Sequence, residues 1–86
     1  MEAENISITR GSKVSIELVD QSGGLEQMEF TLVESKQADL KSGLLDENAP
    51  LARALMSRQA GETIPYEAGD LKEVRILSVR RVEAGG

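Results

Sequence analysis

Residues 46–64 read Asp-Glu-Asn-Ala-Pro-Leu-Ala-Arg-Ala-Leu-Met-Ser-Arg-Gln-Ala-Gly-Glu-Thr-Ile, and this stretch decides the fold because it carries the one convincing helix pattern. Leu51, Ala54 and Leu55 recur at the i, i+3 and i+4 spacing that gives a helix one apolar face. Pro50 suits the first helical turn, where its missing N–H leaves nothing unpaired. Gly61 is expected to end the helix after about two to three turns.

The polar residues around this helix have two expected roles. Asn48, or the acids Asp46 and Glu47 before it, could cap the free amide groups of the first turn. The polar side chains of the helix are expected to point away from the core, and these are Arg53, Ser57 and Arg58.

Two alternating segments precede the helix. Residues 14–18 and 28–32 both place an apolar side chain at every second position, the pattern of a half-buried strand. Residues 20–24 read Asp-Gln-Ser-Gly-Gly, which is typical of a turn. These segments are therefore predicted to form a hairpin. The polar residues 34–48 are predicted to form a surface loop, with a brief strand at residues 43–46.

Two further strands are predicted after the helix. Ile64 and Tyr66 alternate around Pro65, which suits an edge strand because proline cannot donate to a sheet ladder. Residues 74–82 are apolar enough for a central strand, but the alternation changes phase after Ile76. That change predicts either a strand covered on both faces or a bulge between Ile76 and Leu77. The order strand–strand–helix–strand–strand predicts an α+β domain with a mostly antiparallel sheet and one helix on one face.

The composition favours a binding module over an enzyme. The 86 residues contain no Cys, His or Trp, so disulfides, thiol nucleophiles and the commonest general base and metal ligand are all excluded. No cofactor or metal is expected. One domain is predicted over residues 11–82, with an N-terminal arm or edge strand at residues 1–10 and a frayed tail at residues 83–86. Met1 favours a complete gene product.

The charge argues against nucleic acid as a direct partner. Fifteen acidic and ten basic residues give a net charge of −5, the opposite of what phosphate binding favours. The basic residues that stand close together are Arg75, Arg80 and Arg81. No apolar run approaches the ~20 residues of a membrane helix, and the acidic N-terminus is unlike a signal peptide. A cytoplasmic protein with no membrane partner is expected.

The ordered segments of the chain resemble the C-terminal domain of the bacterial GreA/GreB transcription elongation factors. Residues 46–56 and 60–64 are similar to the family's Ser-Pro-Leu helix start, its Ala-Arg-Ala-Leu helix and its Gly-Asp-x-Ile strand entry. Residues 11–14, 30–33 and 72–79 are similar to the family's first, second and last strands in the same order. The resemblance runs from about residue 11 to residue 80.

The resemblance implies an FKBP-like fold and a site that docks on RNA polymerase near its secondary channel. In Gre factors a separate N-terminal coiled coil helps the polymerase to cleave backtracked RNA, and residues 1–10 show no heptads. We therefore expect docking and modulation of elongation without transcript cleavage. Where the family usually has Ser-Pro, this chain has Ala49-Pro50. The residues expected to contact the partner are Asp46, Glu47, Asn48, Ala49, Pro50 and Arg53.

Two alternatives remain at this stage. A prolyl isomerase needs an apolar pocket walled by several aromatic rings, and this chain offers only Phe30 and Tyr66. A ubiquitin-like sulfur carrier would share the strand–strand–helix–strand–strand order and would use the C-terminal Gly85-Gly86 as its reactive end.

Overall fold

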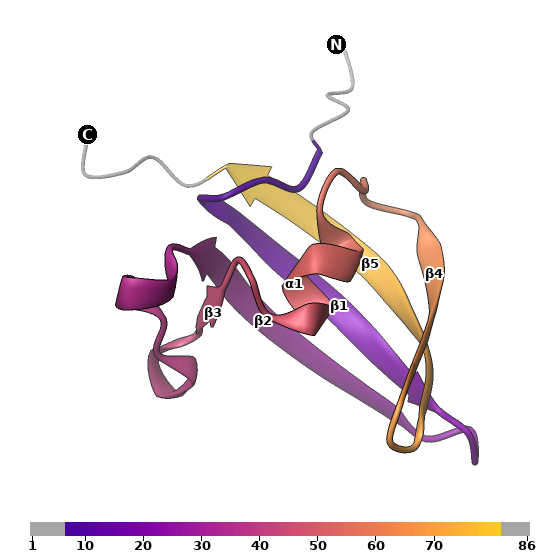
Figure 1. The fold of residues 1–86 in the computed structure, drawn as a ribbon. Coiled ribbons are helices and arrows are strands. Elements are labelled where there is room, and N and C mark those ends of the chain that lie inside the picture. The colour runs from indigo at the N-terminus through magenta and orange to yellow at the C-terminus, as the bar shows by residue number, and fades with distance from the viewer. Residues whose placement is uncertain (1–6, 82–86) are drawn as a thin grey trace, which may run out of the picture.

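The sheet is the framework of the molecule. The computed structural model describes residues 7–81, which form a five-stranded sheet with one short α-helix against one of its faces (Figure 1). The strands lie in the order β3-β2-β1-β5-β4, with β3 parallel to β2 and the other neighbours antiparallel. Their bounds are β1 Ser12–Asp20, β2 Leu25–Val33, β3 Leu44–Asp46, β4 Thr63–Ala68 and β5 Leu71–Arg81. The structure is a mixed five-stranded sheet with little helix, and the short strand β3 stands between β2 and α1 where the predicted order passes directly from strand to helix.

The predicted hairpin is formed by β1 and β2. Alternate side chains of β1 are buried, and Phe30 and Leu32 of β2 join them in the core. At the turn, the Asp20 carboxylate accepts hydrogen bonds from the backbone N–H groups of Gly24 at 2.6 Å and Ser22 at 3.0 Å, which lower its pKa. A Cβ on Gly24 would lie 2.5 Å from Asp20 Oδ2, so a larger residue there would displace this carboxylate, and Gly23 has φ 90°, a value that favours glycine.

The phase change in the last strand is a bulge. Ser15 of β1 pairs with Ser78 of β5, and Ile16 pairs with Ile76, so Leu77 is the extra residue. The bulge returns Val79 to the core face, whereas the side chain of Leu77 is 45% exposed on the other side. The bulge alternative of the sequence prediction is confirmed.

The edge strand and the brief strand also agree with the sequence. β4 lies at one end of the sheet, with Pro65 inside it and a register shift between Pro65 and Ala68. At the other end, β3 follows two turns of 3₁₀ helix, η1 (Ser35–Gln37) and η2 (Leu40–Ser42). Residues 34–43 otherwise form the expected surface loop.

The helix α1 (Pro50–Leu55) is shorter than predicted. It has six residues, fewer than two turns, and ends at Leu55 rather than at Gly61. Ser57 follows in a left-handed conformation with φ 71°, so Ser57 and Arg58 lie outside the helix. The reason is a tertiary contact: Ile8 accepts a hydrogen bond from the Ser57 N–H at 2.9 Å and donates one to the Arg58 carbonyl at 2.8 Å.

The capping prediction was wrong as well. The N-cap residue is Ala49, which has no side-chain cap. Asn48 and the two acids before it contact Ser35 and Arg10 instead. The first turn is instead entered through Pro50, whose lack of an N–H removes one of the groups that a cap would satisfy.

The core lies between the sheet and α1, and the chain before β1 contributes to it. Ile8 is fully buried, and Ser7 forms an isolated bridge with Gln59, so this part of the predicted arm is packed against the domain. Residues 1–6 of the arm and the predicted tail at residues 83–86 lie outside the described residues. The buried cluster comprises Ile8, Val14, Ile16, Leu18, Phe30, Leu32, Leu45, Ala52, Leu55, Ile64, Val74, Ile76 and Val79.

Candidate partner-binding surface

The loop at the head of α1 is held by Asp46. Its Oδ1 accepts hydrogen bonds from the Ser35 hydroxyl at 2.7 Å and from the Asn48 backbone N–H at 2.8 Å. The Asn48 side-chain amide donates to the same hydroxyl at 3.2 Å. The Asn48 N–H, followed by the Ser35 hydroxyl, lowers the pKa of Asp46. Asp46 therefore fixes the path of the loop and ties it to η1.

Glu47 is the second fixed acid of this loop. It accepts two hydrogen bonds from the Arg10 guanidinium, at 3.0 Å from Nε and 2.8 Å from Nη2. The hydrogen bond and charge of Glu47 raise the pKa of Arg10, and Glu34 adds a contact at 3.4 Å. Only 18% of the Glu47 side chain is exposed. Its charge is thus matched by the segment that precedes β1.

The six residues predicted for partner contact separate into two groups. Asp46 and Glu47 are engaged internally, and Ala49 packs partly buried against the core. The remaining three are exposed, and these are Asn48, Pro50 and Arg53. Among residues 7–81 no salt bridge involves Arg53. The exposed part of the predicted site is therefore the head of α1 together with Arg53.

Sequence reasoning missed the residues that position this surface. Ser35 lies 11 residues before Asp46, and Arg10 lies 37 residues before Glu47. Neither belongs to a motif that marks it, since both contacts arise when β3 aligns beside β2. A local pattern could not have identified them.

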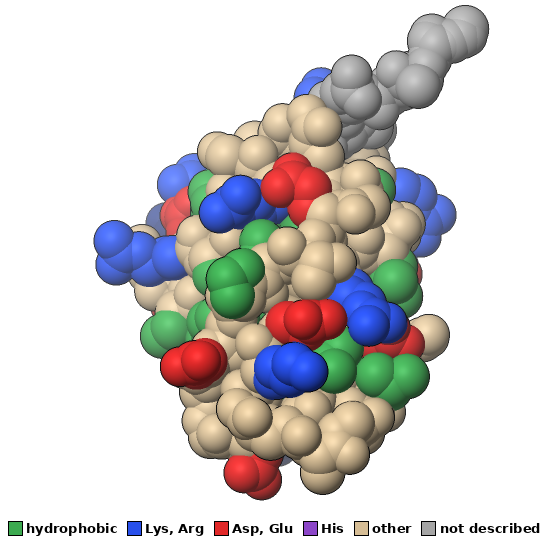
Figure 2. All heavy atoms as spheres, turned by 90° about the vertical axis from the view of Figure 1, so that its right-hand side faces the viewer, with side chains coloured by type: hydrophobic (Ala, Val, Ile, Leu, Met, Phe, Trp, Pro, Cys, Tyr) green, Lys and Arg blue, Asp and Glu red, His purple; other side chains and the backbone are tan. Residues whose placement is uncertain are grey.

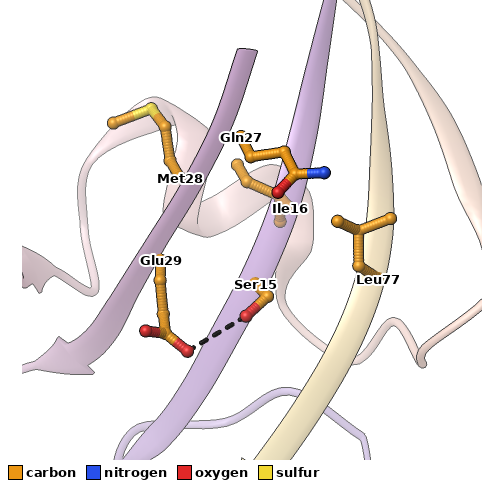
Figure 3. Close-up of a pocket in the computed structure, with 6 residues that line it drawn as sticks. All are labelled: Ser15, Ile16, Gln27, Met28, Glu29 and Leu77. Atoms are coloured by element: carbon orange, nitrogen blue, oxygen red, sulfur yellow. Dashed lines mark hydrogen bonds between the residues drawn. The ribbon is translucent and has the colours of Figure 1, made fainter. Parts of the chain in front are cut away.

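Two shallow hollows lie elsewhere on the molecule. One, of about 300 Å³, opens on the sheet face opposite α1, where Ser15 donates a hydrogen bond to Glu29 beside Leu77 (Figure 3). The other, of about 330 Å³, lies near the β1–β2 turn. Neither is lined by an aromatic ring. Phe30 is 4% exposed and Tyr66 packs against the core, so both rings serve packing, which speaks against a prolyl isomerase pocket.

Charges on the rest of the surface are mixed. Arg75 contacts Glu17 and Glu73, each at 3.3 Å, and Arg80 lies 3.7 Å from Glu29. Figure 2, which faces the β4 side, shows acidic and basic side chains interleaved. Arg75 and Arg80 are thus partly neutralised by acidic side chains of β1, β2 and β5 itself.

Comparison with known proteins decides the family. The family model described as "Transcription elongation factor, GreA/GreB, C-term" matches residues 3–81. The chain belongs to this family. A curated GreA from Anaeromyxobacter sp. (strain K) is 36% identical over 88 residues, covering 94% of this chain and 52% of its own length. GreA from Alkalilimnicola ehrlichii is 36% identical over 67 residues, covering 77% and 42%.

Solved structures of GreA/GreB relatives share the fold. The GreA/GreB factor from Nitrosomonas europaea has a TM-score of 0.66 at 26% identity, covering 91% of this chain and 63% of that one. Gfh1 from Thermus aquaticus has a TM-score of 0.72 at 22% identity, covering 92% and 51%. The chain spans about half the length of the curated relatives it matches.

Family membership confirms the resemblance seen in the sequence. The match with the GreA/GreB C-terminal model includes both hairpins, β3 and α1. It favours a GreA/GreB C-terminal domain over the sulfur-carrier alternative, whose reactive Gly85-Gly86 lies outside the described residues. Within residues 7–81 no helix is long and apolar enough to span a membrane, and no three carboxylates cluster in a way that could hold a metal ion.

Proposed function

We propose that this domain binds RNA polymerase near its secondary channel and modulates transcription elongation without cleaving the transcript. The observation that carries the proposal is the GreA/GreB C-terminal match over residues 3–81. We also infer a cytoplasmic location and an FKBP-like relationship for the fold. The packing of α1 against one face of the sheet supports the latter (Figure 1).

The head of α1 is suited to docking because its conformation is fixed before any partner arrives. Ser35 and Arg10 hold the two acids of the loop, so little conformational entropy is lost when the loop is bound. The exposed groups are chemically varied: Asn48 offers an amide, Pro50 a rigid apolar ring and Arg53 a guanidinium. Arginine is favoured at protein interfaces because its planar group pairs with carboxylates in a defined geometry.

The same contacts support a docking role without chemistry. Asp46 and Glu47 hold hydrogen bonds that shape the loop. A carboxylate that cleaves or aids cleavage must be free to reach substrate or a metal ion. The acids of this surface serve its geometry instead.

The test is direct binding to core RNA polymerase of the source bacterium. With polymerase immobilised at low salt, the wild-type chain should bind, and Arg53→Glu should weaken binding about tenfold or more, equivalent to about 1.4 kcal/mol. Pro50→Ala should weaken it less, since it removes only part of a ring. The matched control is Lys72→Glu, which makes the same charge change at an exposed position of β5 and should bind like the wild type.

Two results would overturn the proposal. The wild-type chain could fail to bind polymerase at low salt, where charge contacts are strongest. Alternatively, Arg53→Glu and Lys72→Glu could weaken binding equally, which would show a response to net charge and no defined surface. Circular dichroism of each variant confirms that the fold is retained.

A further inference from the structure

The turn before β3 presents an unusually exposed leucine. Leu40 is 70% exposed, compared with 59% for Leu25 and 45% for Leu77. It opens η2, in the part of the chain that projects beyond β3 at the edge of the sheet (Figure 1). An exposed apolar side chain gains free energy only when another surface covers it.

The backbone beneath Leu40 is held in place. The Asp39 carboxylate accepts hydrogen bonds from the Lys41 N–H at 3.2 Å and from the Ser42 hydroxyl at 3.1 Å. The backbones of Asp39 and Leu44 are joined by two hydrogen bonds, at 2.9 and 3.0 Å. Gly43 closes the turn with φ 80°, a value that favours glycine. Leu40 therefore projects from an ordered turn.

This turn is continuous with the head of α1. The short strand β3 spans about 10 Å and leads directly from the turn to Asp46. On the other side, Ser35 of η1 contacts both Asp46 and Asn48. The two segments thus lie in one hydrogen-bonded unit.

The charged side chains beside Leu40 are Asp39, whose carboxylate accepts hydrogen bonds from the Lys41 N–H and the Ser42 hydroxyl, and Lys41. Lys41 is exposed and forms no salt bridge with any residue in the described range 7–81. Arg53 of α1 likewise forms no salt bridge within that range. A partner that complements this end of the domain would offer an apolar recess with carboxylates at its rim.

We propose that Leu40 is a second contact of the docking surface and inserts into an apolar, carboxylate-rimmed recess on RNA polymerase, with Lys41 pairing at the rim. This inference rests on the proposed polymerase binding. It extends the partner surface from the head of α1 to the turn before β3.

The test compares two exposed leucines. In the polymerase binding measurement, Leu40→Ser should weaken binding about ten- to a hundredfold, the loss expected when a leucine is no longer buried. Leu25→Ser, at a similarly exposed leucine near the β1–β2 turn, should change binding less than twofold. Lys41→Glu should weaken binding more than Lys72→Glu. Thermal unfolding midpoints should stay close to the wild-type value in all four variants.

The outcomes separate this inference from the proposed function. If Arg53→Glu weakens binding but Leu40→Ser matches Leu25→Ser, the Leu40 contact is wrong and polymerase docking stands. If both leucine variants weaken binding equally, exposed leucines contribute to binding nonspecifically and the inference fails. If the wild type does not bind, polymerase docking and the Leu40 contact fall together.

Discussion

At the scale of single residues, Asp46 links sequence to function through its hydrogen bonds. The Asn48 N–H and the Ser35 hydroxyl stabilise its charged form and hold its pKa below the usual value of about 4. A carboxylate whose pKa is lower in the folded state contributes stability that is fully present above its unfolded pKa. That contribution is lost as the pH falls through the folded value.

Asp46→Asn should therefore flatten the acid limb of the stability profile. At pH 6 the variant should melt slightly below the wild type, because a neutral acceptor replaces a charged one. Between pH 6 and pH 3 its melting temperature should fall less than that of the wild type. Asp70→Asn is the matched control, since it makes the same substitution at an exposed side chain that accepts no hydrogen bond in the described range. Parallel acid limbs for Asp46→Asn and the wild type would show that Asp46 does not fix the loop.

Contacts between residues far apart in the sequence limited how well the roles of single residues could be predicted. The sequence correctly marked residues 46–50 as the segment that leads into the helix, because Pro50 and the apolar spacing after it are local signals. It assigned capping to Asn48 or the acids, whereas Ser35 and Arg10 engage these side chains. A helix cap can be predicted from adjacent residues. A hydrogen bond between residues 37 positions apart, such as that of Arg10 with Glu47, forms only once the sheet has folded.

At the scale of elements, the strands followed their patterns more closely than the helix did. Alternation placed the first hairpin, and the phase change after Ile76 located the bulge at Leu77. The helix pattern continued past Leu55, but the backbone of Ser57 and Arg58 pairs with Ile8 instead. Every residue of a half-buried strand contributes to its alternating apolar pattern, so the pattern locates the strand well. The last residue of a helix depends instead on which hydrogen-bond partner its backbone meets in the folded protein, and helix ends are therefore harder to predict.

Ile8 attaches the segment before β1 to the core. Its side chain is fully buried beside α1, so Ile8→Ala removes core contacts and leaves a cavity. We expect a loss of about 2–4 kcal/mol in the free energy of unfolding, measured with urea. For a domain of 86 residues that is a large share of a total on the order of 5–10 kcal/mol.

The control for Ile8 is Leu25→Ala, which truncates a leucine that is 59% exposed and should change the unfolding free energy by less than about 0.5 kcal/mol. An Ile8→Ala variant as stable as this control would mean that the segment before β1 is not part of the core. The sequence alone left residues 1–10 as an arm or an edge strand, because two isoleucines in a polar stretch do not define a periodicity.

At the scale of the whole molecule, the two faces of the sheet differ in kind. One face is closed by α1 and the core, whereas the opposite face carries ion pairs between strands. Arg75 of β5 pairs with Glu17 of the neighbouring β1, and Arg80 reaches across β1 to Glu29 of β2. Exposed pairs of this sort add little stability and keep the face hydrated. Arg53 in α1 and Lys41 in the Leu40 turn form no salt bridge with any residue in the range 7–81, and the proposed docking rests on these two segments.

A domain that docks by occupancy should compete with longer members of its family. If this chain and a full-length GreA use the same surface of polymerase, only one can be bound at a time, and excess chain should suppress GreA-stimulated transcript cleavage in proportion to its occupancy. The chain alone should produce no cleavage on a stalled, backtracked complex. Arg53→Glu should lose the suppression, and Lys72→Glu should retain it. Undiminished GreA activity at chain concentrations that saturate polymerase would place the two proteins on separate surfaces.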